Sequence, residues 1–274
     1  MANMFGTEST LYIKTVLSNN RTKIEDSYFT APLKIVKPFY NNEQNMAEIM
    51  IMSASAGIME GDRYLIQIEV GEASAISLQC QSYSKIHKMP QGCAKQRNLF
   101  IVRDGGLLDY KPKPTIPFRD SDFISDTSSY LYKGSRYIYS EILACGRDKS
   151  GEQFEFRRYK SHNRVYYCDK LIFLDNQDLK PEIQNLKDIG FFEGYTHQAT
   201  FAYFDDGMHQ ETMIESLYEK LQKYIGIEAG ISAVKFGVVI RLLANGSDYL
   251  ECIIGDIRSE IYDMQTLKRK DLLL

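Results

Sequence analysis

The sequence has few of the residues that build metal clusters and disulfide frameworks. Its 274 residues include no tryptophan, four histidines and five cysteines. The cysteines are widely spaced, their number is odd and none forms a CxxC pair, which excludes a structural zinc module of the usual spacing and argues against a disulfide scaffold. No histidine has a second histidine or a cysteine three or four residues away. We therefore predict no tight metal site built by this chain alone.

Strong charge imbalance and long apolar runs are also missing. There are 33 Lys+Arg against 36 Asp+Glu, a net charge of −3 that argues against a nucleic-acid surface. The apolar stretch at residues 46–59 is broken by Glu48, and the one at 230–244 by Lys235 and Arg241, so neither resembles a membrane helix. The first ten residues lack the features of a signal peptide. These absences predict a cytoplasmic protein with no membrane or nucleic-acid partner.

Common catalytic motifs are absent as well. The sequence has no GxSxG, HExxH or GxGxxG motif. The segment from Gly146 to Gln153 contains Gly-x4-Gly, but Glu152 and Gln153 stand where a phosphate-binding loop has Lys and Ser/Thr. Because it lies between two apparent strands and its carboxylate would repel phosphate, we interpret it as a β-turn.

The first two thirds of the chain have the pattern of short β-strands. Residues 64–70 alternate, with every second side chain apolar. The turn signals Asp104-Gly105-Gly106 and Lys133-Gly134-Ser135 predict two β-hairpins. Strands that recur about every ten residues, with turn signals between them, favour a sandwich, barrel or solenoid over alternating βαβ winding.

The last third of the chain has a different pattern. From Ala199 onward the expected order is strand, helix, strand, strand, helix, and both helices have an apolar face at helical spacing. We therefore predict a mainly β fold, with helically wound or sandwiched strands and two α-helices in an α+β C-terminal portion. We expect residues 1–274 to form a single domain with a β body at about 10–198, the α+β portion at 199–263 and a loose tail at 264–274.

Several polar residues interrupt the β pattern. Gly61 frees the backbone before a strand, and Asp62 places a carboxylate at the entry of that strand. Glu141 is a charge within an otherwise apolar strand, so it either faces a wet internal cavity or points outward from a half-exposed strand. His197 follows Tyr195 closely and is interpreted as a hydrogen-bonded structural histidine.

Four segments together resemble the motifs of a known family, the urease accessory protein family UreD, called UreH in some bacteria. They occur in order, and the resemblance extends from about residue 10 to residue 263. The segments are the Gly-rich Ala56–Arg63 ending in Gly61-Asp62, the polar Gln81–Ile86 containing Ser84-Lys85, the proline segment Pro112–Phe118, and the turn in which Gly146-Arg147 is followed by Gly151-Glu152-Gln153-Phe154.

The resemblance implies a non-enzymatic scaffold for maturation of the urease nickel centre. It implies binding to UreF, which recruits the GTPase UreG, and docking of the assembly on apo-urease. It also implies that nickel passes through a water-filled tunnel in the scaffold, so that Ni²⁺ is transient cargo. The family fold is mainly β, with helically wound strands and two helices near the end. Where the family often has Gly-Gly-Asp, this sequence has Glu60-Gly61-Asp62.

A conduit must release its ion, and carboxylates, hydroxyls and water hold Ni²⁺ less tightly than imidazole or thiolate. We therefore predict that Asp62 and Glu141 face an internal polar channel with Ser84 and Lys85 nearby; Glu60 and Asp175 complete the candidate set. Two alternatives belong to other classes. One is a β-fold hydrolase that uses Asp62 and Glu141 as paired carboxylates, and the other is a protein-interaction module with no metal role.

Overall fold

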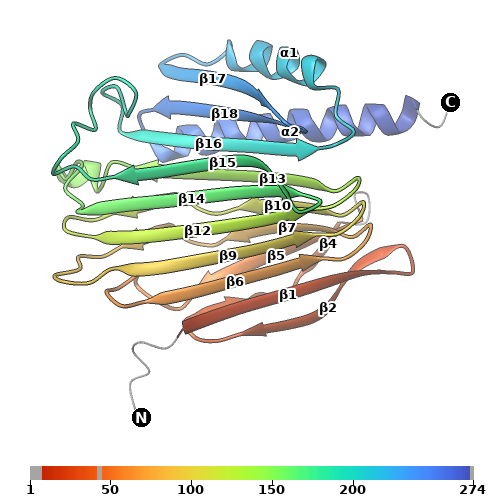
Figure 1. The fold of residues 1–274 in the computed structure, drawn as a ribbon, viewed down its shortest axis with the longest axis horizontal. Coiled ribbons are helices and arrows are strands. Elements are labelled where there is room, and N and C mark those ends of the chain that lie inside the picture. Colours follow the sequence, from red (N-terminus) through yellow and green to blue (C-terminus); the bar gives the residue numbers. More distant parts are fainter. Residues whose placement is uncertain (1–7, 42–44, 272–274) are drawn as a thin grey trace.

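Two large β-sheets lie face to face, and two helices lie beside the second sheet (Figure 1). The computed structural model describes residues 8–41 and 45–271. Sheet A has the strand order β15-β14-β12-β9-β6-β1-β2. Its strands are β1 (Glu8–Ser18), β2 (Arg21–Phe29), β6 (Arg63–Val70), β9 (Ala94–Val102), β12 (Asp122–Leu131), β14 (Arg158–Tyr167) and β15 (Lys170–Leu179).

Sheet B has the strand order β17-β18-β16-β13-β10-β7-β5-β3. Its strands are β3 (Leu33–Ile35), β5 (Met46–Ser53), β7 (Ala75–Cys80), β10 (Leu107–Lys111), β13 (Arg136–Ala144), β16 (His197–Asp205), β17 (Ile227–Val234) and β18 (Gly237–Ala244). Three short strands pair beside this path: β4 (Phe39–Asn41), β8 (Ser84–Ile86) and β11 (Thr115–Pro117). The helices are α1 (Gln210–Leu221) and α2 (Ser247–Asp271), and a single 3₁₀ turn spans Asp148–Ser150.

The chain winds as a β-solenoid rather than a sandwich of antiparallel hairpins. It passes from β6 to β7, from β9 to β10 and from β12 to β13, crossing each time from sheet A to sheet B. Strands of successive coils pair in parallel, as β6 with β9 and β9 with β12. The predicted mainly β class with two helices in the C-terminal portion is confirmed. Of the two predicted arrangements, helically wound or sandwiched strands, the structure has the helically wound one.

The two predicted hairpins are wrong. The strands that flank Gly105 lie in different sheets, and so do those that flank Gly134. Both glycines have φ of +67°, so the turn signals mark true left-handed positions. The Gly105 N–H donates to the Lys133 carbonyl at 2.9 Å, which stacks one turn on the next. A turn signal specifies a local backbone conformation but not the strand with which the next segment pairs.

The main core fills the space between the two sheets. The alternation predicted for residues 64–70 is confirmed, because Tyr64, Ile66, Ile68 and Val70 are buried while the residues between them are not. Parallel pairing places like residues in line, as with Val70 opposite Val102 and Val102 opposite Leu131. These apolar rows bury the inner face of each coil against its neighbours.

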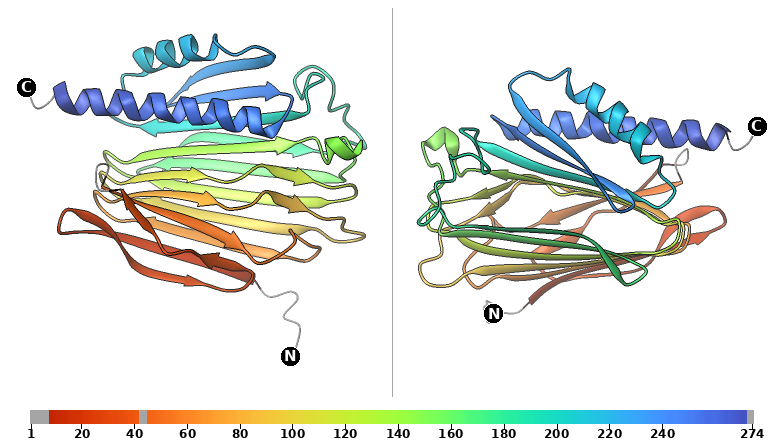
Figure 2. Two further views of the ribbon diagram at one scale, coloured as in Figure 1. Left: turned by 180° about the vertical axis from the view of Figure 1, so that it is seen from behind. Right: turned by 45° about the horizontal axis from the view of Figure 1, so that its top comes forward.

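The C-terminal portion extends sheet B and covers its outer face. The order β16, α1, β17, β18, α2 confirms the predicted order of strands and helices. A second core, separate from that between the sheets, packs both helices against sheet B (Figure 2). Helix α2 continues to Asp271, so residues 264–271 of the expected loose tail are helical, and 272–274 lie outside the described residues. Among the described helices, none is both long and apolar enough to cross a membrane.

A buried ion pair joins α2 to sheet B. The Asp109 carboxylate on β10 is fully buried and accepts from Arg258 Nε at 3.0 Å and from the Tyr262 hydroxyl at 2.9 Å. Arg258 also donates to Ser140 Oγ at 2.7 Å, and Lys111 Nζ lies 3.0 Å from Asp109. These directional contacts set where α2 sits along the sheet.

Candidate functional site

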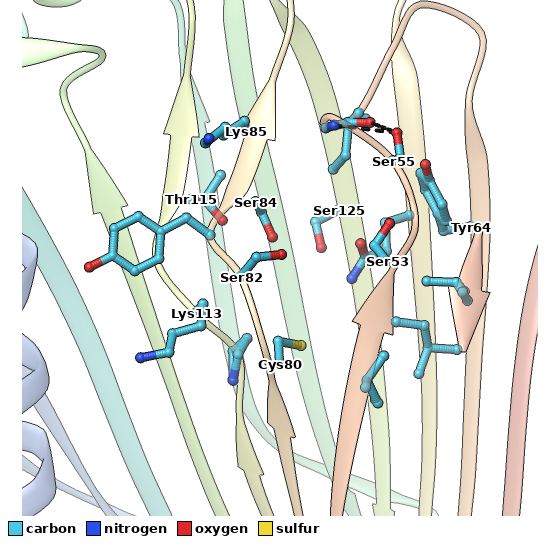
Figure 3. A pocket seen from close by; sticks show the side chains of 18 of the residues that line it. Ser53, Ser55, Tyr64, Cys80, Ser82, Ser84, Lys85, Lys113, Thr115 and Ser125 are labelled. Carbon is cyan, nitrogen blue, oxygen red and sulfur yellow. Dashed lines mark hydrogen bonds between the residues drawn. The ribbon is translucent and has the colours of Figure 1, made fainter. Parts of the chain in front are cut away.

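A cavity of about 290 Å³ opens into the space between the sheets. Its rim is formed by the segment after β5, the chain from β7 to β8, and the proline segment between β10 and β11 (Figure 3). β8 and β11 pair in parallel, and the Ser84 N–H donates to the Pro114 carbonyl at 3.0 Å. Prolines fix φ, so they stiffen this wall of the cavity.

Hydroxyl groups line the outer part of the cavity. Ser53, Ser82, Ser84 and Ser125 point into the same space from three different segments (Figure 3). Lys85 lies at the rim and is exposed, whereas Lys113 points away and its ammonium lies 2.6 Å from the Glu251 carboxylate on α2. Gln81 also lines the cavity. The predicted residues Ser84, Lys85 and Gln81 are therefore brought together at its mouth.

Glu141 lies at the inner part of the cavity and is the one carboxylate among the described lining residues. It accepts from the hydroxyls of Tyr139 and Tyr159, from Ser161 Oγ at 3.2 Å and from Asn163 Nδ2 at 3.4 Å. Burial raises the pKa of both tyrosines well above the ordinary value for tyrosine, and the nearby Glu141 carboxylate raises it further. Both hydroxyls therefore stay protonated and act as donors. Four donors offset the cost of placing this charge inside the protein.

Polar side chains continue inward from the cavity across successive strands of sheet A. Asn98 pairs with Thr127 and Thr127 with Asn163 in the parallel register, and Asn163 pairs with Asp175 on β15. Asn98 Nδ2 donates to Thr127 Oγ1 at 2.9 Å. We call Asn98, Thr127, Asn163 and Asp175 the polar row. It crosses the solenoid interior at right angles to the strands.

Asp175 lies at the far end of the polar row. Its side chain is 12% exposed, and Oδ1 accepts from Arg241 Nη2 of β18 at 2.9 Å. It is not among the residues that line the cavity. The ion pair with Arg241 closes the row where sheet A ends at β15 and sheet B continues through β16 and β18.

Asp62 and Glu60 lie beside the cavity rather than in its lining. The Asp62 carboxylate accepts from the Met59 N–H at 2.8 Å and from the Tyr64 hydroxyl at 2.9 Å, and Tyr64 does line the cavity. Gly61 has φ of +83° in the turn between them. The Glu60 carboxylate accepts from the backbone N–H groups of residues 91 and 92. Asp62 therefore touches the site through one shared tyrosine, and Glu60 holds an adjoining loop.

The turn between β13 and β14 is a structural unit away from the polar row. A Cβ on Gly146 would lie 2.6 Å from the Glu152 carbonyl oxygen, and Gly151 ends the 3₁₀ turn with φ of +76°. Arg147 pairs with the Glu152 carboxylate, which also accepts from the Arg119 N–H at 2.7 Å. Burial opposes ionisation of Glu152, but these donors outweigh it and hold its pKa below the usual range.

Tyr195 lies in the loop before β16, and His197 is the first residue of that strand. The Tyr195 N–H donates to the Phe192 carbonyl at 2.7 Å. Nδ1 of the buried His197 accepts from the Gly246 N–H at 3.1 Å and lies 2.8 Å from the Thr196 hydroxyl. The ring thus ties β16 to the start of α2.

His197 should make stability depend on pH. Burial lowers the pKa of its imidazole, so the unfolded chain binds a proton at a pH where the folded chain does not. Stability is then highest above the ordinary histidine pKa and declines as the pH falls through it. We expect the melting temperature to fall more steeply between pH 7 and pH 5 in the wild type than in His197→Asn. Parallel pH profiles for the two proteins would contradict this assignment.

No group of three or more His, Cys, Asp or Glu side chains within the described ranges is placed to hold a metal ion. The sequence reasoning found Glu141 but missed the residues that hold it, Tyr139, Tyr159 and Asn163. Each of these residues is a polar residue on the inward face of its own strand. The sequence does not show that they lie together, because that depends on how neighbouring strands pair.

The sequence model described as UreD urease accessory protein matches residues 8–272. The chain belongs to the UreD family. A urease accessory protein UreD from Acetivibrio thermocellus is 50% identical over 263 residues, which make up 96% of this chain and 100% of that protein. A urease accessory protein UreH from Helicobacter hepaticus is 38% identical and covers 90% of this chain and 95% of its own length. A UreH from Helicobacter pylori strain G27 is 31% identical over 90% of this chain and 92% of its own.

Membership of the UreD family makes the chain a urease accessory protein, a maturation factor rather than an enzyme. The hydrolase alternative is thereby ruled out. Its premise of paired carboxylates also has no support in the geometry, because Asp62 is engaged by Met59 and Tyr64 outside the cavity that holds Glu141.

Proposed function

We propose that this UreD protein is the cytoplasmic scaffold of a urease maturation complex and that it acts with UreF and the GTPase UreG on apo-urease. Ni²⁺ then crosses its interior past Glu141, which contacts Asn163, and along the polar row. The proposal rests first on Glu141, an ionisable group held by four donors inside a cavity lined with hydroxyls. Asp62, Glu60, Ser84, Lys85 and Asp175 remain candidates for the path.

The chemistry of this interior suits passage better than storage. Ni²⁺ binds tightly to imidazole and thiolate ligands, whereas the cavity offers a single carboxylate, hydroxyls and amides. The Cys80 sulfur also lines the cavity, but burial raises the pKa of its thiol to about 11, so it is not a thiolate at neutral pH. The Glu141 oxygens already accept hydrogen bonds, so a passing ion competes with those donors for each oxygen. Such a site attracts a hydrated cation by its charge and lets it leave.

Replacing Glu141 with glutamine tests the proposal. The amide keeps the shape but removes the charge, and we expect the nickel content and activity of urease matured with this variant to fall by about three- to tenfold, equivalent to a loss of about 1 kcal/mol of stabilisation along the path. The measurement is co-expression with apo-urease, UreF and UreG, followed by metal analysis and a urease assay.

The matched control is Glu72→Gln, an exposed carboxylate on the turn between β6 and β7. It makes the same chemical change outside the interior and should leave nickel loading unchanged. Full loading with Glu141→Gln would remove Glu141 from the path, and full urease activation with no UreD chain present would contradict the scaffold role itself.

A further inference from the structure

The two sheets end at four edge strands, and three of these edges carry features that discourage pairing with another chain. Protein edges are commonly protected by charges, by bulges or by being very short. In sheet A, β2 contains four charged residues, β15 contains three, and each pairs with its neighbour through a register shift. In sheet B, the edge strand β3 is three residues long.

The fourth edge, β17, has no bulge, is not short and carries a single charge. It is eight residues long and pairs with β18 in continuous register from Ile227 to Val234. Its one charged residue is Glu228, and it contains no proline. It is the last strand of sheet B, and no further strand pairs with its outer edge in the described part of the chain (Figure 1). Most of its residues are exposed.

Gly230 lies at the centre of β17, where glycine weakens a strand. Its φ is not in the left-handed region, and a Cβ built there would have no heavy atom within 4 Å. Neither its own backbone nor packing within this chain therefore requires a glycine. Within strands, glycine often marks a place where another backbone approaches closely.

The flank of this edge is acidic. Glu211, Glu215 and Glu219 are exposed on α1 and succeed one another at four-residue spacing, a like-charge arrangement that destabilises a helix. Helix α1 packs against β17, and Glu228 on the strand adds a fourth carboxylate. None of the four forms an ion pair in the described residues. Across an interface, complementary charge steers a partner and sets its register.

We propose that the outer edge of β17 receives an extended segment of a partner protein in the urease maturation complex, a segment that carries Lys or Arg side chains and adds a strand to sheet B. Backbone hydrogen bonds along the edge would supply affinity, and the acidic flank would select a basic segment. The partner's membership of that complex rests on the proposed function; the strand-addition site rests on β17 itself.

A second copy of this chain is the less suitable occupant. Two copies joined through β17 in antiparallel fashion would extend one sheet and place both α1 helices on the same side of it. Their exposed glutamates would then repel each other. A basic segment removes that repulsion and also neutralises the row at Glu211, Glu215 and Glu219.

Hydrogen exchange tests the site directly. We expect the backbone amides of residues 227–234 to exchange at least tenfold more slowly in the complex assembled from UreD, UreF, UreG and apo-urease than in the free chain. The amides of β2, the edge of the other sheet, serve as the internal control and should change little. Assembly without added protection of β17 would overturn the inference and leave the proposed function intact.

Two further arms complete the test. Protection of β17 that rises with the concentration of the free chain would identify a second copy as the occupant and overturn the proposal. Failure of the four proteins to assemble would overturn both the inference and the proposed function.

A pair of substitutions at the exposed Ser232 tests the charge of the segment. Ser232→Lys places a positive charge beside the incoming strand and should weaken assembly by about three- to tenfold. Ser232→Glu has similar size and should leave assembly unchanged or strengthen it. Equal affinities for the two variants would contradict a basic partner.

Discussion

Replacing Arg258 with leucine should lower the free energy of unfolding by about 3–5 kcal/mol, the usual cost of leaving one member of a buried ion pair unpartnered. Asp109 is fully buried and depends on Arg258 for a charge-assisted hydrogen bond. Removal of the guanidinium also leaves Ser140 Oγ and the Tyr110 carbonyl without this donor. The loss should be concentrated at α2, which these contacts hold on sheet B.

Urea denaturation followed by circular dichroism gives the size of the effect, and hydrogen exchange of the α2 amides gives its location. The double variant Asp109→Leu/Arg258→Leu removes both charges and should recover most of the lost stability, because an apolar pair can replace a buried ion pair with little cost. A loss below about 1 kcal/mol for the single variant would show that Lys111 and Tyr262 satisfy Asp109 unaided.

Replacing Phe204 with alanine should cost about 3–5 kcal/mol through a cavity at the C-terminal end of the main core. The ring is 1% exposed, stacks on Tyr137 with centroids 6.3 Å apart and meets Phe173 of β15 at 5.7 Å. It also lies against the backbone at Gly237, where an added Cβ would be 2.6 Å from the ring. Neighbours on three strands cannot all move inward to fill the space.

Phe236→Ala is the matched control for this prediction. Phe236 lies in the β17–β18 turn, is 36% exposed and contacts one ring, that of Tyr167. We expect its removal to cost less than about 1 kcal/mol, since a half-exposed ring loses little burial. Thermal or urea unfolding of both variants makes the comparison, and similar losses would mean that Phe204 does not close the core.

Local pattern was sufficient to predict the strand and helix content. Alternation in β6 and the apolar face of α2 both depend on side chains two to four residues apart, so the burial of Ile66, Ile68, Ile254 and Ile257 follows from the sequence alone. The order of elements after Ala199 could be predicted for the same reason.

The coil-to-coil pairing could not be predicted in this way. Val70 of β6 pairs with Val102 of β9, although β7 and β8 lie between them in the sequence, and no local signal records that register. The turns at Gly105 and Gly134 are compatible both with a hairpin and with a passage between sheets, because each connection can use a left-handed glycine.

The site was predictable only where its signal is local to one strand. A charge in an apolar strand identified Glu141 as unusual, but its direction depended on which face of β13 meets sheet A. Asn98 and Thr127 are ordinary polar residues in their own strands and acquire meaning only as neighbours in the parallel register.

The polar row has a length that depends on the number of coils. Adjacent strands lie about 4.8 Å apart, so the three steps from Asn98 to Asp175 span about 14 Å. Adding or deleting one complete coil would change that span by one strand spacing while leaving the mouth and the far end chemically unchanged. Because coils are added or removed whole, the distance between the two ends of the polar row changes in fixed steps of one strand spacing.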